Sequence, residues 1–261
     1  MDRIQVPENE YARRTAELAP QGSTAVIAYI YSLPLEERVE AVRSAQKALF
    51  AAAHEGGSLD TYAEAMRELI DRGTSALGRV GHNEEDDQTL NQYNAMSFNL
   101  AADLADCWPE DKLQREAHHF EAGLRAAEDC VRWRNELNRP PYSFALAYWA
   151  KGMHLLSLGH YSGAVKSFAM AGGAARRDAE EKDISAEVGP GTTFSVLLNE
   201  GYLGIAEQLD DSGEGLSRLQ RAEGFFRDQI ARGNESGDTE LKEEAEFGIA
   251  QLETVRAKYI H

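Results

Sequence analysis

The sequence predicts an all-α protein built from helix pairs that stack on one another, and three observations support this prediction. Alanine, glutamate, leucine and arginine dominate the 261-residue chain, without the alternation of β-branched residues that is typical of strands. Proline and glycine clusters divide the chain into segments of helical length. Small residues recur in four of these segments at Ala101, Gly152, Gly201 and Gly248, with spacings of 51, 49 and 47 residues.

Residues 1–34 are expected to form a helical appendage. Pro20 and Gly22 separate a first helix at about 8–18 from a short apolar helix at 24–32. The apolar run in the second of these helices is far too short to cross a bilayer. The N-terminal residues also lack the charged and then apolar layout of a secretion signal, so we expect a soluble, cytoplasmic protein.

Four helix pairs are expected to follow, and residues that stop helices bound each of them. The first pair spans about 35–77, with a turn at two consecutive glycines. The second spans 89–136, with a break at CWPEDK before a long helix at about 112–136. The third pair spans 142–177, and the fourth spans 194–231 with a DDSGEG connection. A final helix at 239–259 is expected to cap the stack.

The segment 144–171 has the most regular pattern of small and aromatic residues: Gly152, Leu155, Gly159, Tyr161, Ala164, Phe168 and Ala171. These offsets resemble those of a tetratricopeptide repeat. Gly152 and Ala164 would let two helices approach closely, while Tyr161 and Phe168 would fill the space between layers. The resemblance implies that residues 35–261 form a right-handed α-solenoid of antiparallel hairpins, with units longer than the family's 34 residues.

The same resemblance implies a concave groove lined by the first helix of each pair. Counting from the small residues places seven side chains there: Phe98, Asn99, Leu146, Trp149, Met153, Asn199 and Tyr202. Most of them are apolar or aromatic, which suits a bound amphipathic helix. The lysine and arginine set with which chaperone-binding members of the family hold a C-terminal carboxylate is missing from these positions.

The composition is strongly acidic, with a formal net charge of −17 and a pI near 4.8. This charge argues against binding to nucleic acid or to an anionic membrane surface. A solvated acidic surface is the favoured interpretation of the charge, and a basic segment attracted as a partner is the alternative. The two cysteines, Cys107 and Cys130, fall on apolar helix faces, so we expect buried free thiols in a reducing compartment.

Candidate chemistry is sparse in this sequence. Glu116 and His119 are spaced to share a helix face, as metal ligands do in carboxylate bundles, but the sequence has no second Glu-x-x-His pair. His118 and His119 would point about 100° apart on a helix, which disfavours a shared ion. Phosphate-binding loops and nucleophile elbows are also missing from the sequence. We therefore expect no catalytic residues, metal or cofactor.

The leading hypothesis is a non-enzymatic interaction module or adaptor that binds a peptide or an amphipathic helix in the apolar groove. One alternative is that the groove side chains belong to the core, covered by the 24–32 segment or by the last helix. Two further alternatives are an all-helical enzyme or small-ligand binder with scattered site residues, and a scaffold that associates with a second copy of itself.

Overall fold

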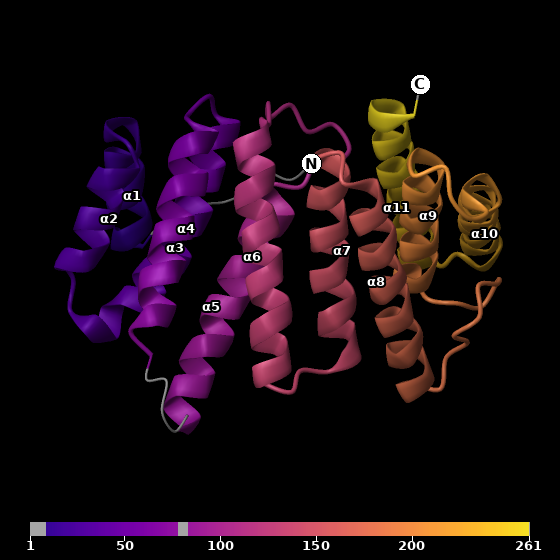
Figure 1. The fold of residues 1–261 in the computed structure, drawn as a ribbon, viewed down its shortest axis with the longest axis horizontal. Coiled ribbons are helices and arrows are strands. Elements are labelled where there is room, and N and C mark those ends of the chain that lie inside the picture. The colour runs from indigo at the N-terminus through magenta and orange to yellow at the C-terminus, as the bar shows by residue number, and fades with distance from the viewer. Residues whose placement is uncertain (1–8, 78–82, 261) are drawn as a thin grey trace. The chain divides into compact units, whose positions relative to one another are not determined.

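The computed structural model describes residues 9–77 and 83–260, and within these ranges the chain forms eleven α-helices and no strand (Figure 1). The prediction of an all-α protein is confirmed. The first eight residues of the predicted appendage lie outside the described ranges. None of the helices in those ranges is both long enough and apolar enough to cross a membrane.

The chain divides into two compact units. Of the described residues, the first unit contains those up to Leu104 together with 112–137, and the second contains 105–111 together with those from Asn138 onward. Within each unit, helices that are consecutive in the chain pack on one another.

The first unit contains a short 3-10 turn, η1 (Ala19–Gln21), and six helices: α1 (Glu10–Leu18), α2 (Ser23–Ser32), α3 (Leu35–His54), α4 (Leu59–Ser75), α5 (Glu84–Asp103) and α6 (Ala117–Glu136). Side-chain caps fix three of the helix starts, because Asn9, Ser58 and Asn83 accept hydrogen bonds from main-chain N–H groups of the first turn. The largest fully buried side chains of this unit come from α2, α3, α4 and α5: Ile30, Leu49, Tyr62, Met66, Leu69, Ile70, Met96 and Leu100.

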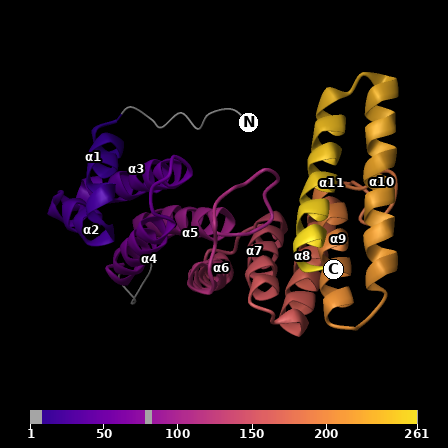
Figure 2. The ribbon, with the colours of Figure 1, turned by 90° about the horizontal axis from the view of Figure 1, so that it is seen from above.

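The second unit contains five helices (Figures 1 and 2): α7 (Pro141–Ser157), α8 (Tyr161–Glu181), α9 (Phe194–Leu209), α10 (Gly215–Ser236) and α11 (Thr239–Tyr259). Pro140 and Pro141 start α7, where a missing N–H costs nothing. Thr193 and Asp238 cap α9 and α11 through their side chains.

Close approach of α7 and α8 depends on small residues. A Cβ atom added to Gly152 would lie 2.6 Å from the Phe168 ring, so the aromatic ring occupies the space that the glycine leaves open. A cluster of small buried side chains continues this packing across α7, α8 and α9: Ala145, Ala174, Ala175 and Val196. The partner of Gly152 in this structure is therefore Phe168 in the second helix of the pair.

Two helix starts differ from the predicted bounds of the 89–136 pair. Helix α5 begins at Glu84, five residues early, because Asn83 caps it and four acidic residues suit the positive end of its dipole. Helix α6 begins at Ala117 instead of about 112, because Glu116 and His119 form a reciprocal capping box there.

Candidate functional site

Four of the predicted groove residues lie in the interior of the second unit. Met153 and Tyr202 have no exposed surface, and Trp149 is 6 % exposed. Asn199 is also buried, and Leu146 is half-buried. The structure brings Trp149 and Tyr202 together, with ring centroids 6.5 Å apart.

The chain itself covers these side chains. The Tyr202 ring stacks on Phe168 at 5.4 Å, and its hydroxyl donates a 3.1 Å hydrogen bond to Gln251 on α11. Trp108, from the 105–111 segment of the same unit, packs edge-on against Trp149 at 5.9 Å. This placement matches the alternative in which the last helix and core packing cover the groove. Binding of a partner by these residues remains an untested prediction.

The other two predicted groove residues, Phe98 and Asn99, belong to the first unit. Phe98 is half-buried, with the Arg134 guanidinium 5.1 Å from its ring centroid. Asn99 is exposed and donates a hydrogen bond to the Gln46 amide oxygen at 3.3 Å.

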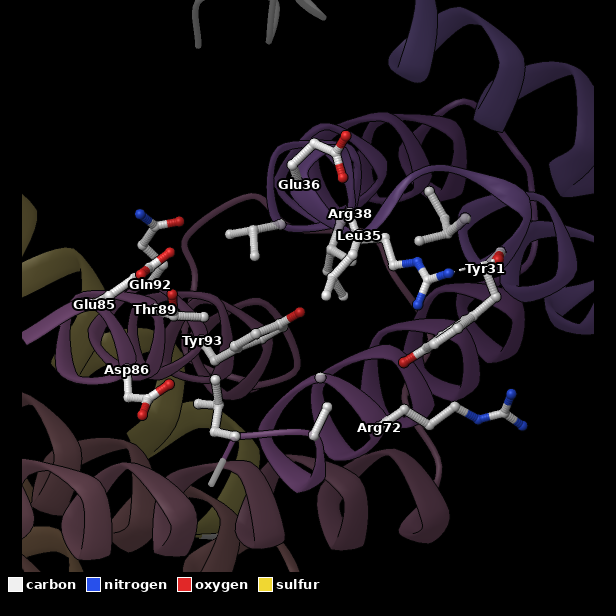
Figure 3. Close-up of a pocket in the computed structure, with 16 residues that line it drawn as sticks. Tyr31, Leu35, Glu36, Arg38, Arg72, Glu85, Asp86, Thr89, Gln92 and Tyr93 are labelled. Carbon is white, nitrogen blue, oxygen red and sulfur yellow. Dashed lines mark hydrogen bonds between the residues drawn. The ribbon is translucent and has the colours of Figure 1, made fainter. Parts of the chain in front are cut away.

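A cleft of about 570 Å³ in the first unit is the strongest candidate for a binding site (Figure 3). The end of α2, the start of α3, the end of α4 and the start of α5 form its walls. We refer to it as the α2–α5 cleft. Its lining includes aromatic, basic and aliphatic side chains and one glycine: Ile30, Tyr31, Leu35, Arg38, Val42, Arg72, Gly73 and Tyr93.

Arg38 holds the corner between α2 and α3, which Pro34 creates by starting α3 from an extended backbone. The Arg38 guanidinium donates hydrogen bonds to the main-chain oxygens of Leu33 and Tyr31, each at 3.1 Å. It also lies 5.0 Å from the centroid of the Tyr31 ring. Among the described residues it forms no ion pair with a carboxylate, so a half-buried cation faces the cleft.

Tyr31 lies between two guanidinium groups. Arg38 and Arg72 approach its ring centroid at 5.0 and 5.2 Å, a cation–π arrangement. Burial raises the pKa of the Tyr31 hydroxyl above its ordinary value of 10.0, and the positive charges of Arg72 and Arg38 oppose this change. Tyr31 therefore remains a neutral hydroxyl donor at physiological pH.

Tyr93 forms the opposite wall and is 4 % exposed. A Cβ atom added to Gly73 would lie 2.1 Å from Cζ of Tyr93, so only glycine lets the phenol ring rest on α4. Burial, helped by nearby Tyr31, raises the pKa of Tyr93 to about 12. Figure 3 shows the Tyr31 and Tyr93 hydroxyls pointing toward each other across the cleft.

The rest of the cleft combines an apolar floor with an acidic end. Ile30 and Val42 are buried in the floor, whereas Leu35 is 70 % exposed at the rim. Glu85 and Asp86, in the first turn of α5, lie at the end away from Tyr31 (Figure 3). An exposed apolar rim beside charged groups of both signs is a common feature of recognition surfaces.

A second cleft in the first unit is dominated by ion pairs. Arg67 lies 2.7 Å from Asp129 and also pairs with Asp71, while Arg132 reaches Asp129 at 2.6 Å. The contact between Arg67 and Asp129 is electrostatic and lies off the line of a hydrogen bond. Because these charged groups are already paired with one another, this cleft is a weaker candidate for a ligand site than the α2–α5 cleft.

Among the described residues, Asp60, His118 and His119 bring potential metal-ligand atoms within 4.8 Å of one another. The Nε2 atoms of His118 and His119 lie 2.6 and 2.9 Å from the same Asp60 oxygen. The sequence-based expectation that the two rings diverge therefore misses how Asp60, from the start of α4, approaches both.

Hydrogen bonding to His119 disfavours metal binding in this arrangement. Its Nδ1 accepts the main-chain N–H of Glu116 at 3.0 Å, so the neutral ring carries its hydrogen on Nε2, which faces Asp60. A metal would need the Nε2 lone pair. Burial, followed by the charge of His118, lowers the pKa of His119 below 6.5, and the His118 hydrogen bond lowers the pKa of Asp60. The group therefore fits a contact between α4 and α6 in which His118 forms the hydrogen bond to Asp60 and His119 lies beside it.

A buried carboxylate organises the second unit. Glu200 on α9 is 2 % exposed and accepts hydrogen bonds from Arg176 of α8 at 3.0 Å and from Arg218 and Arg221 of α10 at 2.9 and 2.8 Å. Arg218 also binds Glu207 at 3.0 Å. Burial by itself would raise the pKa of Glu200, but the arginine hydrogen bonds hold it below its ordinary value of 4.5.

Sequence reasoning missed the residues of the α2–α5 cleft because no local motif joins them. Tyr31, Arg38, Arg72 and Tyr93 come from four different helices. Gly73 was the available signal, since an isolated glycine inside a helical pattern often marks a close approach.

We compared the sequence with protein-family models and with curated proteins, and any functional assignment rests on the geometry described above. Neither a family model nor a curated protein matches the sequence.

Proposed function

We propose that this protein is a non-enzymatic interaction module that binds a segment of a partner protein in the α2–α5 cleft. The observation that carries this proposal is the cleft itself, which combines about 570 Å³ of space, an apolar floor and groups of both charge signs. An exposed Leu35 beside Tyr31 offers the kind of apolar and aromatic surface on which binding energy is usually concentrated.

The tetratricopeptide-like architecture forms part of the same proposal. We infer that the helix pairs are antiparallel hairpins stacked as an α-solenoid. The support is the α7–α8 pair, where Gly152 packs under Phe168 and Ala164 is buried. Proteins of this architecture commonly present a binding surface to other proteins. Cys107 and Cys130 are buried and form no disulfide in the described part of the chain, which agrees with a reducing compartment such as the cytoplasm.

Site-specific photo-crosslinking tests where a partner binds. Leu35 is replaced by p-benzoylphenylalanine in the host cell, and the crosslinked proteins are identified by mass spectrometry. The matched control carries the same crosslinker at Leu216, an exposed leucine on α10 of the second unit. We expect a defined adduct at position 35 that is absent at position 216, and a second copy of this chain would be recognised by its own peptides.

A blocking variant tests the same proposal independently. Ala76→Trp places a bulky ring at the exposed edge of the cleft, whereas Ala16→Trp places one on an exposed face of α1 outside it. We expect the first substitution to abolish the adduct at position 35 and the second to preserve it. Equal adduct yields in both variants would refute the proposal.

A small-ligand binder is the second candidate, and the volume of the cleft favours it. Pockets for small molecules typically enclose about 300–1,000 Å³, a range that includes this cleft. Native mass spectrometry of the protein purified from its host would show a bound molecule as an added mass. Loss of that mass in Ala76→Trp, with retention in Ala16→Trp, would favour this function over protein binding.

A further inference from the structure

We propose that the Tyr31–Tyr93 end of the α2–α5 cleft binds a carboxylate group attached to an apolar body, such as an acidic or C-terminal group of a bound peptide. This inference rests on the proposed function and adds the chemistry of the ligand. It begins from three hydrogen-bond donors that converge on one end of the cleft: the Arg38 guanidinium and the hydroxyls of Tyr31 and Tyr93 (Figure 3).

The first step concerns what these donors already bind. A guanidinium has five N–H donors, and Arg38 gives one hydrogen bond to Leu33 and one to Tyr31, both to main-chain oxygens. These two bonds fix the group at the corner between α2 and α3 without neutralising its charge. A ligand carboxylate would find a cation that is already held in place, which lowers the entropy lost on binding.

The second step concerns the two hydroxyls. Tyr93 is more than nine-tenths buried, and no described residue donates a hydrogen bond to its hydroxyl or accepts one from it. Gly73 holds the Tyr93 ring in this orientation, since a Cβ at that position would overlap the end of the ring. The Tyr31 hydroxyl likewise has no described partner and points across the cleft toward Tyr93 (Figure 3). Phenols that remain protonated donate to an oxyanion, and the raised pKa values of both tyrosines keep them protonated.

The third step selects the body of the ligand. Glu36, Glu85 and Asp86 also line the cleft, and the whole chain carries a net charge of −17. A free inorganic anion would have only the three donors to offset this negative field, and no apolar contact. A carboxylate on an apolar body would also bury its hydrocarbon part against Leu35 and Val39, which line the cleft and keep exposed surface. Such a molecule fits the cleft better than phosphate alone.

The probe for this site is 3-phenylpropionate, with neutral 3-phenylpropionamide and inorganic phosphate as comparisons. Titrations of the full chain are followed by NMR at the Arg38 Nε–H and tyrosine ring signals. We expect saturable shifts with the carboxylate, and binding that is weaker by at least about tenfold for the amide, because hydrogen bonds to charged groups are the stronger class. Equal binding of the amide, or tighter binding of phosphate, would overturn the proposal.

Variants assign the effect to the named groups. Arg38→Gln should weaken 3-phenylpropionate binding by about tenfold or more, while Arg14→Gln on the exposed face of α1 should leave it unchanged. Because Arg38 also holds the α2–α3 corner, a second variant combines Tyr31→Phe with Tyr93→Phe and removes only two oxygen atoms. Its control is Tyr142→Phe in the second unit. Unchanged affinity in the double variant would refute the site.

The two proposals can fail separately. Crosslinking at position 35 reports a partner whatever group that partner presents, whereas 3-phenylpropionate reports the donor site without any partner. An adduct at position 35 combined with no binding of 3-phenylpropionate would therefore overturn the carboxylate site alone.

Discussion

Gly73 is the residue on which the shape of the α2–α5 cleft depends, because the Tyr93 ring occupies the space that any larger side chain needs. The conflict is severe, since an added Cβ would lie 2.1 Å from Cζ of Tyr93. The phenol ring is rigid and only 4 % exposed, so it has little free space into which it could move. The helix therefore accepts a residue of poor helix propensity in exchange for the close contact.

Gly73→Ala is expected to destabilise the protein by about 1–3 kcal/mol, because it overpacks the α4–α5 contact. The matched control is Gly224→Ala on α10, where an added Cβ meets nothing within 4 Å. That change should be neutral or stabilising by up to about 1 kcal/mol, since alanine favours a helix. Urea denaturation of both variants measures the difference, and equal effects would contradict the contact between Gly73 and Tyr93.

Glu200 stabilises the second unit through charge, and its removal leaves three guanidinium groups without their shared acceptor. We expect Glu200→Gln to lower the free energy of unfolding by about 3 kcal/mol, toward the lower end of the range for a broken buried ion pair because the arginines are partly exposed. Glu253→Gln, at an exposed site on α11, should have little effect. Chemical denaturation at neutral pH provides the measurement.

The pH dependence of Glu200 follows from its lowered pKa. A carboxyl group whose pKa is lower in the folded state contributes stability above its ordinary value of 4.5 and loses it as the pH falls through the folded pKa. Part of the loss of stability below pH 4.5 should therefore disappear in Glu200→Gln. An acid-unfolding profile identical to that of the parent protein would rule out this contribution.

At the scale of elements, α4 and α6 are joined by the Asp60, His118 and His119 contact. His119 is a base whose pKa is lowered in the folded state, so the unfolded chain takes up more protons below pH 6.5. The stability that its neutral form contributes is complete above that value and declines as the pH falls. His119→Gln should show a smaller loss of stability between about pH 7.5 and 5.5 than the parent protein. The exposed His160→Gln variant serves as the control, and a steeper loss in His119→Gln would contradict the assignment.

Helix α7 gives a direct test of whether the predicted groove is interior. Trp149 is buried among Trp108 and Tyr202, so Trp149→Ala should destabilise the fold by about 3–5 kcal/mol. Met170→Ala on α8 removes a half-exposed side chain and should cost less than about 1 kcal/mol. Thermal unfolding compares the two. A melting temperature unchanged by Trp149→Ala would mean that the side chain is available to a partner.

The sequence predicted a helix boundary well where a local residue, such as a proline or a capping side chain, marks it. The starts of α3, α9 and α11 lie at the predicted positions 35, 194 and 239, and in the structure Pro34, Thr193 and Asp238 stand immediately before them. The start of α6 could not be predicted in that way, because a Glu and His capping box lies outside the usual signals. The α2–α5 cleft could not be predicted because Tyr31 and Tyr93 meet only through the packing of four helices.

At the scale of the whole molecule, the two compact units do not follow a simple division of the sequence. Residues 105–111 lie between α5 and α6 in the chain but belong to the second unit. There Trp108 contacts Trp149 and Phe247, and Asp106 pairs with Lys258 of α11. A periodic spacing of small residues predicts which helices pack closely on another helix. It does not predict where a segment that connects two helices packs.

The net charge of −17 makes the stability of the whole molecule depend on salt concentration. Two opposing effects of salt follow from it, because ions screen repulsion among the 44 acidic residues and also weaken surface ion pairs. Exposed pairs such as Arg14–Glu17 and Arg72–Glu68 contribute only about 0–1 kcal/mol each. The Glu200 cluster is buried and is screened less. Repulsion should therefore be the larger of the two effects.

Raising NaCl from about 0.05 to 0.5 M, which shortens the Debye length from more than 10 Å to less than 8 Å, is accordingly expected to raise the melting temperature. Each kcal/mol gained would raise it by about 2–4 °C for a protein of this size. KCl at equal ionic strength should give the same increase, which separates screening from specific ion binding. A variant in which Glu84, Glu85 and Asp87 are neutralised should respond less to salt, because it starts with weaker repulsion at the start of α5. A melting temperature that falls with salt in the parent protein would contradict this prediction, because it would make ion pairs the dominant electrostatic contribution to stability. Charge pairing across the fold would then have to offset the excess of acidic residues.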